Sequence, residues 1–338
     1  MNPLSGYAAC KSVVVTHTDD GTQTNYQMKL TIVKGDGSDS AGTTYLDNKA
    51  LNWPYDIRFT KADGVTLLDF WREEYDATDG TWWIEVDSIP DPDNATIYLH
   101  VGDADATDAS NGENTFLLFD HFDDSSLNTD LWEKYETGGA TVVESGTAVV
   151  IDTSAGAGNG ALTSNSANGY SFGYKAIRAR MKTNLFASTA VLTAGGFGNK
   201  WLQPPYAIAG WNHNSGSTYN GSYWNYASSY ATSAILGWSA DTYAVIDFMR
   251  MGSGKNTYKV DDANQVDITT QVSTATDLEV TFNAVYVSAQ GIVTIDWVLV
   301  RNMTLTEPTW GAWGDWETGA TLKRSVPRIA RIMLACHG

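Results

Sequence analysis

The part of this 338-residue chain whose residue types most clearly suggest chemistry is an aromatic-rich segment, residues 201–238. It holds nine Trp and Tyr residues, about twice the chain average of 12%, and contains no Asp, Glu, Lys or Arg. Flat rings suit the apolar face of a sugar, and the interleaved Asn and Ser suit its hydroxyl groups. The candidate glycan-binding residues are Trp201, Tyr206, Trp211, His213, Tyr219, Tyr223, Trp224, Tyr226 and Tyr230.

Two other interpretations of this segment stay open. Trp and Tyr are also enriched at protein interfaces, so the segment could be a subunit contact. Alternatively, a long loop could fold its own aromatic side chains into a local core. The composition of residues 201–238 does not distinguish these three roles.

Paired carboxylates for sugar hydrolysis are not evident. A retaining glycosidase needs two carboxyl groups about 5 Å apart. The one Glu-x-Asp pattern, Glu85 and Asp87, is followed by Pro90 and lacks a second Glu three residues after the Asp, so it reads as an ordinary strand end. Few glutamates lie in the second domain, residues 114–312, and none has a second acid at a suitable spacing in a strand: Glu133, Glu136, Glu144, Glu279 and Glu307.

Other catalytic patterns are also missing. A lyase would need a His among tyrosines, and His213 is the candidate, but its Gly, Asn and Ser neighbours predict an exposed side chain. The serine-hydrolase, zinc-protease and phosphate-loop motifs do not occur. We therefore expect no catalytic residues. The alternative is a glycoside hydrolase or polysaccharide lyase with an unrecognised site.

Calcium is the one candidate ion, and we expect no required cofactor. Asp120, Asp123 and Asp124 lie close together in the sequence and offer oxygen ligands of the kind that Ca²⁺ prefers. A second acidic stretch, Asp103-x-Asp105, begins like a calcium loop but has Asp108 where such a loop needs Gly.

The elements that must position these residues are strands. Thr, Tyr, Trp, Val and Gly are abundant, and apolar residues recur with a period of two. The fold class predicted is all-β, with two antiparallel β-sandwich (jelly-roll) domains at 1–113 and 114–312, joined by the small, acidic segment 102–115. The predicted strands are 11–16, 26–33, 56–60, 65–71, 81–86, 95–101, 142–144, 148–152, 174–182, 243–251, 257–260, 278–287 and 292–301.

A Trp-rich, basic tail at 313–338 completes the chain. Tryptophans recur every three residues at Trp310, Trp313 and Trp316. Further on, apolar residues share one helical face and arginines the other, which predicts a short amphipathic helix. That helix could dock on its own domain, contact other protein subunits, or lie on a membrane surface. The apolar positions are Leu322, Val326, Ile329, Met333 and Cys336.

Charge and hydropathy exclude several classes of function. The net charge of −18, with 29 Asp and 10 Glu, argues against nucleic acid as a partner. No run of about 18 apolar residues predicts a transmembrane segment, and the first nine residues lack the features of a secretory signal. The two cysteines, Cys10 and Cys336, cannot form a small disulfide framework, so we expect free thiols, with an intermolecular bridge as the alternative.

Residues about 7–110 resemble a domain of unknown function found in bacterial, archaeal and phage surface proteins. The blocks that carry this resemblance are DIRFT at 56–60, ADGVTLL at 62–68, WIEV at 83–86 and IYLHVG at 97–102. Such a domain often precedes a concanavalin A-like domain in surface and fibre proteins.

Residues about 116–303 resemble the concanavalin A-like lectin/glucanase sandwich. The blocks are FDHFDD at 119–124, LNTDLW at 127–132, YKAIRARM at 174–181 and IDWVLVR at 295–301. This fold carries lectins, adhesins, hydrolases and lyases, so it does not decide the activity.

The two resemblances together imply a non-enzymatic surface or virion protein, such as an adhesin or a phage-fibre protein. We expect its second domain to bind carbohydrate and its location to be extracellular or at a virion surface. The alternative from another class is a structural subunit of a virion or extracellular assembly.

Overall fold

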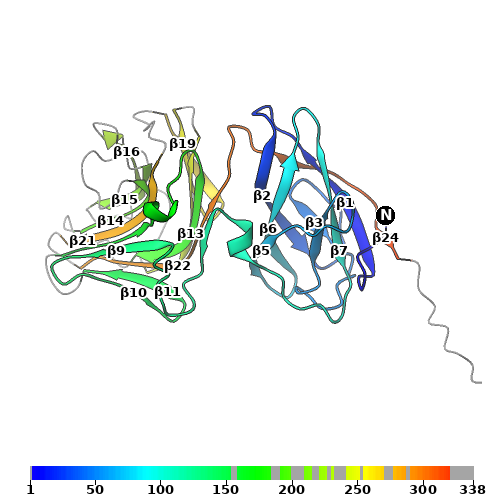
Figure 1. Cartoon of the computed structure of the whole chain (residues 1–338), viewed down its shortest axis with the longest axis horizontal. Coiled ribbons are helices and arrows are strands. Elements are labelled where there is room, and N and C mark those ends of the chain that lie inside the picture. Colours follow the sequence, from blue (N-terminus) through cyan, green and yellow to red (C-terminus); the bar gives the residue numbers. More distant parts are fainter. Residues whose placement is uncertain are drawn as a thin grey trace, which may run out of the picture.

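The computed structural model describes residues 2–153, 158–183, 191–198, 209–214, 221–226, 230–231, 241–251, 254–269, 277–286 and 290–319. Within them the chain is almost entirely β, folded as two sandwiches that lie side by side (Figure 1). The predicted fold class is confirmed. The predicted helix at 322–336 lies outside the described residues, and no helix within them is long and apolar enough to span a membrane.

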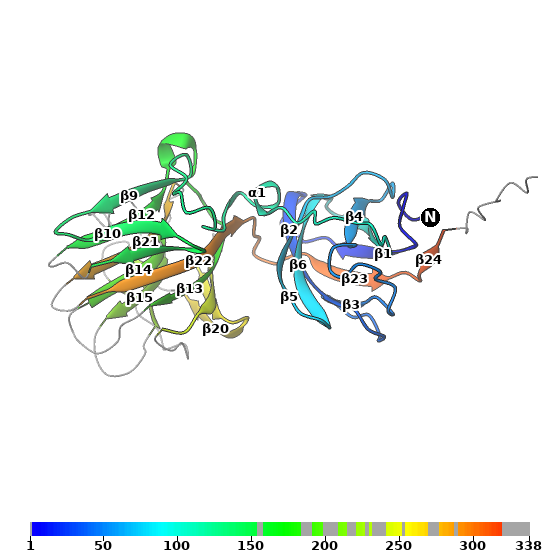
Figure 2. The same cartoon turned by 90° about the horizontal axis from the view of Figure 1, so that it is seen from below.

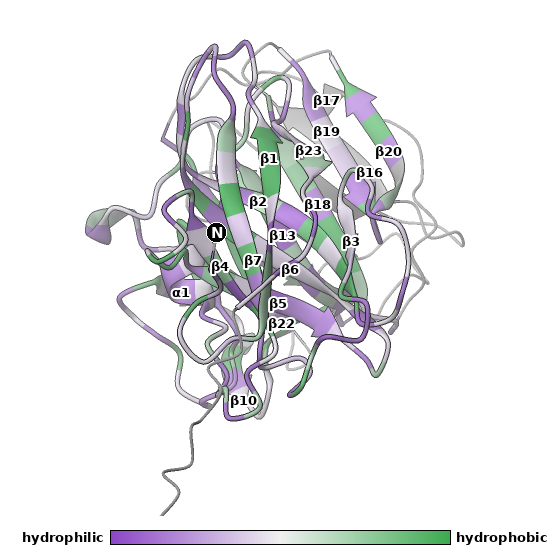
Figure 3. Ribbon diagram, turned by 90° about the vertical axis from the view of Figure 1, so that its right-hand side faces the viewer, coloured by the Kyte–Doolittle hydropathy of each residue, from purple (hydrophilic) through white to green (hydrophobic). Residues whose placement is uncertain are grey.

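The first sandwich is built from a five-stranded and a four-stranded sheet. The five-stranded sheet contains β1 (Ala9–Thr16), β4 (Arg58–Lys61), β7 (Ala95–Val101), β23 (Thr309–Trp313) and β24 (Glu317–Thr318). The four-stranded sheet contains β2 (Gln23–Val33), β3 (Thr43–Tyr45), β5 (Phe70–Tyr75) and β6 (Asp79–Ile89). All pairs are antiparallel except β2 and β3. Figure 3 shows hydrophobic and hydrophilic residues alternating along these strands, as half-buried strands require.

The second sandwich has an eight-stranded and a seven-stranded sheet, and a short helix α1 (Gly112–Thr115) leads into it. The eight-stranded sheet contains β8 (Leu118–Asp120), β10 (Thr141–Ser145), β11 (Ala148–Asp152), β13 (Ala176–Thr183), β18 (Ala244–Arg250), β19 (Asn256–Val260), β20 (Ala263–Ile268) and β22 (Ile292–Arg301). The seven-stranded sheet contains β9 (Trp132–Glu136), β12 (Asn159–Ser164), β14 (Val191–Gly198), β15 (Ala209–Asn214), β16 (Gly221–Tyr226), β17 (Tyr230–Ala231) and β21 (Glu279–Tyr286). A 3₁₀ turn spans Ser166–Asn168.

The four sheets form four successive layers, because the two middle sheets pack against each other (Figure 2). Successive side chains of strand β6 point to opposite faces of its sheet, so this strand contributes residues to two different hydrophobic clusters. Trp82 lies in the core of the first sandwich, whereas Trp83 lies in the cluster between the sandwiches. That cluster comprises Trp71, Trp83, Phe116, Phe119, Trp297 and Leu299, all less than a tenth exposed.

The chain returns to the first sandwich after completing the second. Strand β23 pairs with β1, with Trp310 opposite Val15, and β24 pairs with β1 near its start. The second sandwich is therefore inserted between β7 and β23, and two segments of chain join the lobes in Figure 1. This differs from the expected boundary at residue 312, which cuts through β23. The physical reason is that β23 pairs with β1 and places Trp310 in the first core, a long-range pairing that the local sequence pattern does not contain.

The three regularly spaced tryptophans of the tail all contact the first sandwich. Trp310 is buried in its core and donates its indole N–H to the carbonyl of Lys29 at 2.6 Å. The ammonium of the buried Lys11 lies 5.0 Å from the Trp313 ring and 4.5 Å from the Trp316 ring. The start of the tail is thus part of the first sandwich. On β1, the neighbouring Cys10 is a buried free thiol.

A buried arginine joins the two sandwiches electrostatically. Arg178 on β13 is 1% exposed and donates two hydrogen bonds to Glu73 of the first sandwich, at 2.7 and 2.9 Å. It also bonds Asp247 on β18 and Asp262 in the β19–β20 turn. Lys29 of the first sandwich reaches the same Asp262 at 2.5 Å. Such a buried cation tolerates desolvation only because its donors are paired.

Replacing Arg178 by Ala is expected to lower the free energy of unfolding by about 3–5 kcal/mol, because it leaves buried carboxylates without their cation. Arg180→Ala is the matched control. It removes the same residue type two positions along β13, where the side chain is 41% exposed, and should cost less than about 1 kcal/mol. Denaturant unfolding followed by circular dichroism measures both. Equal losses in the two variants would contradict this role for Arg178.

Replacing Trp310 by Ala is expected to destabilise the chain by about 3–5 kcal/mol, because it opens a cavity in the first core. Leu305→Ala serves as the control in the same returning segment, since Leu305 is 50% exposed and its removal should change stability by less than about 0.5 kcal/mol. Thermal unfolding of both proteins compares the two. A Trp310 variant as stable as the Leu305 variant would show that the return strand adds nothing to the first core.

Candidate functional site

The seven-stranded sheet brings residues from six strands into continuous register rows. One row runs from β9 to β16 and consists of Glu133, Thr163, Thr281, Gly196, Gly210 and Trp224. The next row consists of Tyr135, Ala161, Asn283, Ala194, Asn212 and Ser222. Of β15, β16 and β17 the structure describes the backbone only.

These two rows lie on the face of the sheet that points away from the sandwich core. Phe282 and Val280 of β21 are buried in the core, so the alternating residues Thr281 and Asn283 lie on the opposite face. Because the other sheet of this sandwich packs on the first sandwich, this outer face is the one farthest from it (Figure 1). We call it the distal face.

The residue types along the distal face suit a hydroxyl-rich ligand. Thr163 and Thr281 are buried and lie within hydrogen-bonding distance of each other, 3.3 Å between hydroxyl oxygens. Gly196 and Gly210 stand next to each other in the middle of the row and contribute no side chain to this face. Hydroxyl and amide groups can both donate and accept, which sugar hydroxyls require.

The register divides the sequence-predicted residues into two groups. Trp224 falls in a distal row, and Tyr226, two positions further along β16, pairs with Tyr230 on β17. Trp211 pairs with Tyr223, and their row continues to the buried core residue Phe282. The row of His213 likewise includes a buried core residue, Ala284, so both rows fall on the core side of the sheet. The remaining three, Trp201, Tyr206 and Tyr219, lie outside the described residues. Which of the nine contact a ligand stays a prediction.

Sequence reasoning missed the polar half of the distal face. Thr281, Phe282 and Asn283 do alternate polar and apolar along β21, which is a visible pattern. However, only the pairing of β9, β12 and β21 sets Glu133 and Thr163 beside them.

The seven strands carry few carboxylates. Their sequences contain Glu133 and Glu136 on β9 and Glu279 on β21, and none on the other five strands. Glu133 and Glu279 share the distal face but stand two strands and two residues apart, about 12 Å between Cα atoms. A retaining pair needs about 5 Å and an inverting pair up to about 9.5 Å between carboxyl groups.

The Glu-x-Asp pattern of the first sandwich has a structural role. Glu85 accepts a hydrogen bond from the amide of Gln27 at 3.1 Å, and Asp87 pairs with Lys61 at 2.6 Å. Both lie on β6, in the first sandwich and away from the distal face. This agrees with the expectation of an ordinary strand end.

Two of the three predicted calcium ligands, Asp120 and Asp124, accept hydrogen bonds in the structure, and calcium binding stays a prediction. Asp120 accepts from the backbone N–H of Phe122 and from the indole of Trp132, at 2.8 and 2.7 Å. Asp124 accepts from the backbone N–H of Ser126. No group of three or more His, Cys, Asp or Glu suited to a metal ion occurs among the described residues.

Glu144, which sequence analysis passed over, has the most perturbed carboxyl beside these aspartates. It is 7% exposed, and burial, followed by its hydrogen bond with Asp124 and the charge of Asp120, raises its pKa to about 7. Burial also raises the pKa of Asp120. The folded chain is therefore most stable in this region, residues 120–144, when the Glu144 carboxyl is protonated.

Comparison with known proteins gives one family match. Residues 53–135 match the model of a domain of unknown function, DUF2341, which covers less than half of the chain. The match overlaps the resemblance found for residues 7–110 and extends through β9 into the second sandwich. No curated protein matches the chain.

Solved structures of glucanases are similar to the chain over little more than half its length. The β-glucanase of Bacillus licheniformis has 15% identity, covering 55% of this chain and 98% of that one, with a TM-score of 0.43. The laminarinase of Flavobacterium sp. UMI-01 has 12% identity, covering 55% and 100%, with a TM-score of 0.43. A pseudo β-1,3-glucanase of Mycobacterium tuberculosis has 14% identity, covering 56% and 99%, with a TM-score of 0.41.

Replacing Glu144 by Gln is expected to change the pH dependence of stability. The folded chain holds this proton more tightly than the unfolded chain, so wild-type stability falls as pH rises from the ordinary pKa of 4.5 to about 7. The variant should therefore melt a few degrees higher than wild type at pH 8 and show a smaller gain at pH 5.

Glu136→Gln is the control of opposite sign. Burial by itself would raise the pKa of Glu136. The hydrogen bond from the backbone N–H of Val142 and the ion pair with Lys134 outweigh this effect and lower the pKa. The charged form is therefore stabilised by folding, and the Gln variant should be less stable than wild type at pH 8. Scanning calorimetry of both variants at the two pH values makes the comparison. A Glu144 variant that melts no higher than wild type at pH 8 would contradict the assignment.

Proposed function

We propose that this protein recognises carbohydrate on the distal face of its second sandwich and does not cleave it. The observation that carries the proposal is the register row in which Glu133, two threonines, two glycines and Trp224 follow one another across six strands. Six strands span about 24 Å, enough for a chain of several sugar units.

The chemistry along this row matches that of a sugar chain. An aromatic residue at the Trp224 position offers stacking surface for the apolar face of a pyranose ring. The hydroxyls of Thr163 and Thr281, which are buried and bonded to each other, and the amide of Asn283 in the next row are groups of the kind that bond sugar hydroxyls. The glycines between them allow the ligand to approach the sheet closely. Each feature serves binding, and none requires a reactive group.

The spacing of the carboxylates supports binding rather than hydrolysis. Glu133 and Glu279 are the carboxylates whose positions fall on the distal face, and within the seven strands neither has a second carboxylate beside it in its own row. A single carboxylate such as Glu133 can still accept hydrogen bonds from sugar hydroxyls.

We infer that the protein works outside cells or on a virion surface, with the first sandwich as a spacer. The supporting observations are the layered arrangement, which places the distal face farthest from the first sandwich, and the net charge of −18, which favours solubility. Contact with other subunits through the tail at 313–338 stays a prediction.

A glycan array screened with the full chain, with and without Ca²⁺, is expected to identify a bound oligosaccharide. Trp224→Ala should then weaken binding about tenfold or more. Removing an aromatic side chain from a binding site commonly costs about 1–3 kcal/mol of binding free energy. Thr281→Val, which removes one hydroxyl at nearly constant volume, should also weaken it. Tyr75→Ala is the control, since Tyr75 is a half-exposed aromatic on the first sandwich.

Three outcomes would change the conclusion. Release of shortened oligosaccharides would replace binding by hydrolysis or elimination. Loss of binding in the Tyr75 variant, with Trp224→Ala unchanged, would move the site to the first sandwich. No binding by a folded chain to any glycan would favour a structural subunit.

A further inference from the structure

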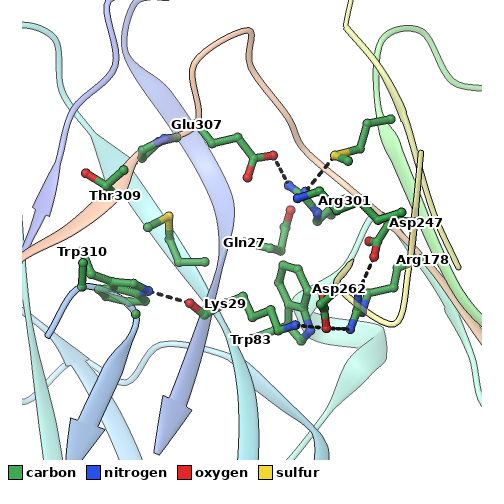
Figure 4. A pocket seen from close by; sticks show the side chains of 16 residues that line it. Gln27, Lys29, Trp83, Arg178, Asp247, Asp262, Arg301, Glu307, Thr309 and Trp310 are labelled. Atoms are coloured by element: carbon green, nitrogen blue, oxygen red, sulfur yellow. Dashed lines mark hydrogen bonds and ion pairs between the residues drawn. The ribbon is translucent and has the colours of Figure 1, made fainter. Parts of the chain in front are cut away.

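A cavity of about 300 Å³ lies between the two sandwiches, beneath the returning segment of chain (Figure 4). The first sandwich contributes Lys29 and Met28, the second contributes Lys259 and Arg301, and the returning segment contributes Glu307 and Trp310, among other residues. We call it the interdomain cleft. Cavities between domains are frequent sites for small molecules.

The cleft differs in charge from the rest of the molecule. Its wall contains four cationic side chains and three carboxylates, in a chain whose net charge is −18. Arg178 and Lys29 are engaged by Glu73, Asp247 and Asp262, as described above. Two cations remain, and one carboxylate faces them.

The first remaining cation is Arg301. It is 4% exposed, and its guanidinium lies 5.3 Å from the ring of Trp83, which holds it in place. Its Nη1 donates to the carboxylate of Glu307 at 2.7 Å, and among the described residues its buried Nε has no hydrogen-bond partner. The side chain of Glu307 is 41% exposed, so this pairing can open toward solvent without disturbing a core.

The second remaining cation is Lys259 on β19. It stands opposite Asp247 in register, and Asp247 stands opposite Arg178, so the three side chains share the face of the sheet that lines the cleft. Within the described part of the chain no ion pair or hydrogen bond engages the Lys259 ammonium. Within the described residues, the cleft therefore offers the Lys259 ammonium without a partner and the Arg301 guanidinium, whose partner Glu307 a ligand carboxylate can replace.

The opposite wall of the cleft is apolar. Met28 and Trp310 are buried there, 5% and 6% exposed, and Met249 lies next to the Arg301 guanidinium. Figure 4 shows Trp310 on one side of the cavity and Arg301 with Glu307 on the other. A ligand that fits must combine a compact apolar surface with a negative charge.

We propose that the interdomain cleft binds a small organic carboxylate of about the size of one sugar ring. The ligand carboxylate takes the place of Glu307 on Arg301, Lys259 supplies the second positive charge, and the body of the ligand packs against Met28 and Trp310. Glu307 is an internal competitor that occupies the arginine when no ligand is bound. This site is separate from the distal face and does not depend on it.

The test compares glucuronate with glucose, which has the same ring but carries a hydroxymethyl group in place of the carboxylate. Titration calorimetry on the full chain at low salt should detect glucuronate and not glucose. Glu307→Gln should tighten glucuronate binding about tenfold, because it removes the competing carboxylate but keeps the side-chain volume. Lys259→Gln should weaken it several-fold, and added salt should weaken it further.

Trp224→Ala should leave glucuronate binding unchanged, which separates this site from the proposed glycan site. Glu307 and Lys259 are partly exposed, so their variants are expected to melt near the wild-type temperature, which confirms that they are folded. Equal binding of glucose, no binding of glucuronate, or an affinity that Glu307→Gln leaves unchanged would each overturn the proposal.

Discussion

The arrangement of the whole molecule depends on one buried cation. Arg178 extends from the second sandwich into contact with Glu73 of the first, and Asp247 and Asp262 complete its surroundings. Burial would raise the pKa of Asp262, but the hydrogen bond and charge of Arg178 outweigh this and lower it, so the carboxylate stays ionised. Charge pairing of this kind has a fixed geometry, whereas the apolar contacts around Trp83 and Trp297 would tolerate small rotations. The ion pairs therefore fix how the two middle sheets face each other.

The connectivity reinforces this orientation. A domain attached at one end can swivel, but here the chain enters the second sandwich through α1 and leaves it through residues 302–308. The exit segment is itself held, since Asn302 bonds to Gln27 and Thr306 bonds to Asp20 of the first sandwich. Strand β23 then completes the first core with Trp310. The first sandwich is therefore discontinuous in sequence, because its strands come from both sides of the inserted second sandwich.

The two proposed sites follow from this layering. Because the two middle sheets cover each other, the outer faces belong to the five-stranded and the seven-stranded sheets, and the small and hydroxyl-bearing residues distinguish the seven-stranded one. The interdomain cleft exists because the returning segment passes over the seam at Glu307 and leaves space beneath it. The distal face belongs to one sandwich, whereas the cleft requires both.

The sequence by itself determined the all-β class and most strand positions, because a period of two is a local property. For β13, residues of the sequence alternate between apolar and charged, and the apolar Ile177 and Met181 lie in the core. The sequence also marked the aromatic segment and the absence of paired acids. It did not determine what Arg178 faces, where β23 pairs, or which residues join Trp224 in one row, since strand partners far apart along the chain set all three. The sequence by itself assigns Trp310 to the start of a tail. The local pattern does not show that its strand pairs with β1, which lies some 300 residues earlier. Long-range pairing and the docking of the two sandwiches decided these features.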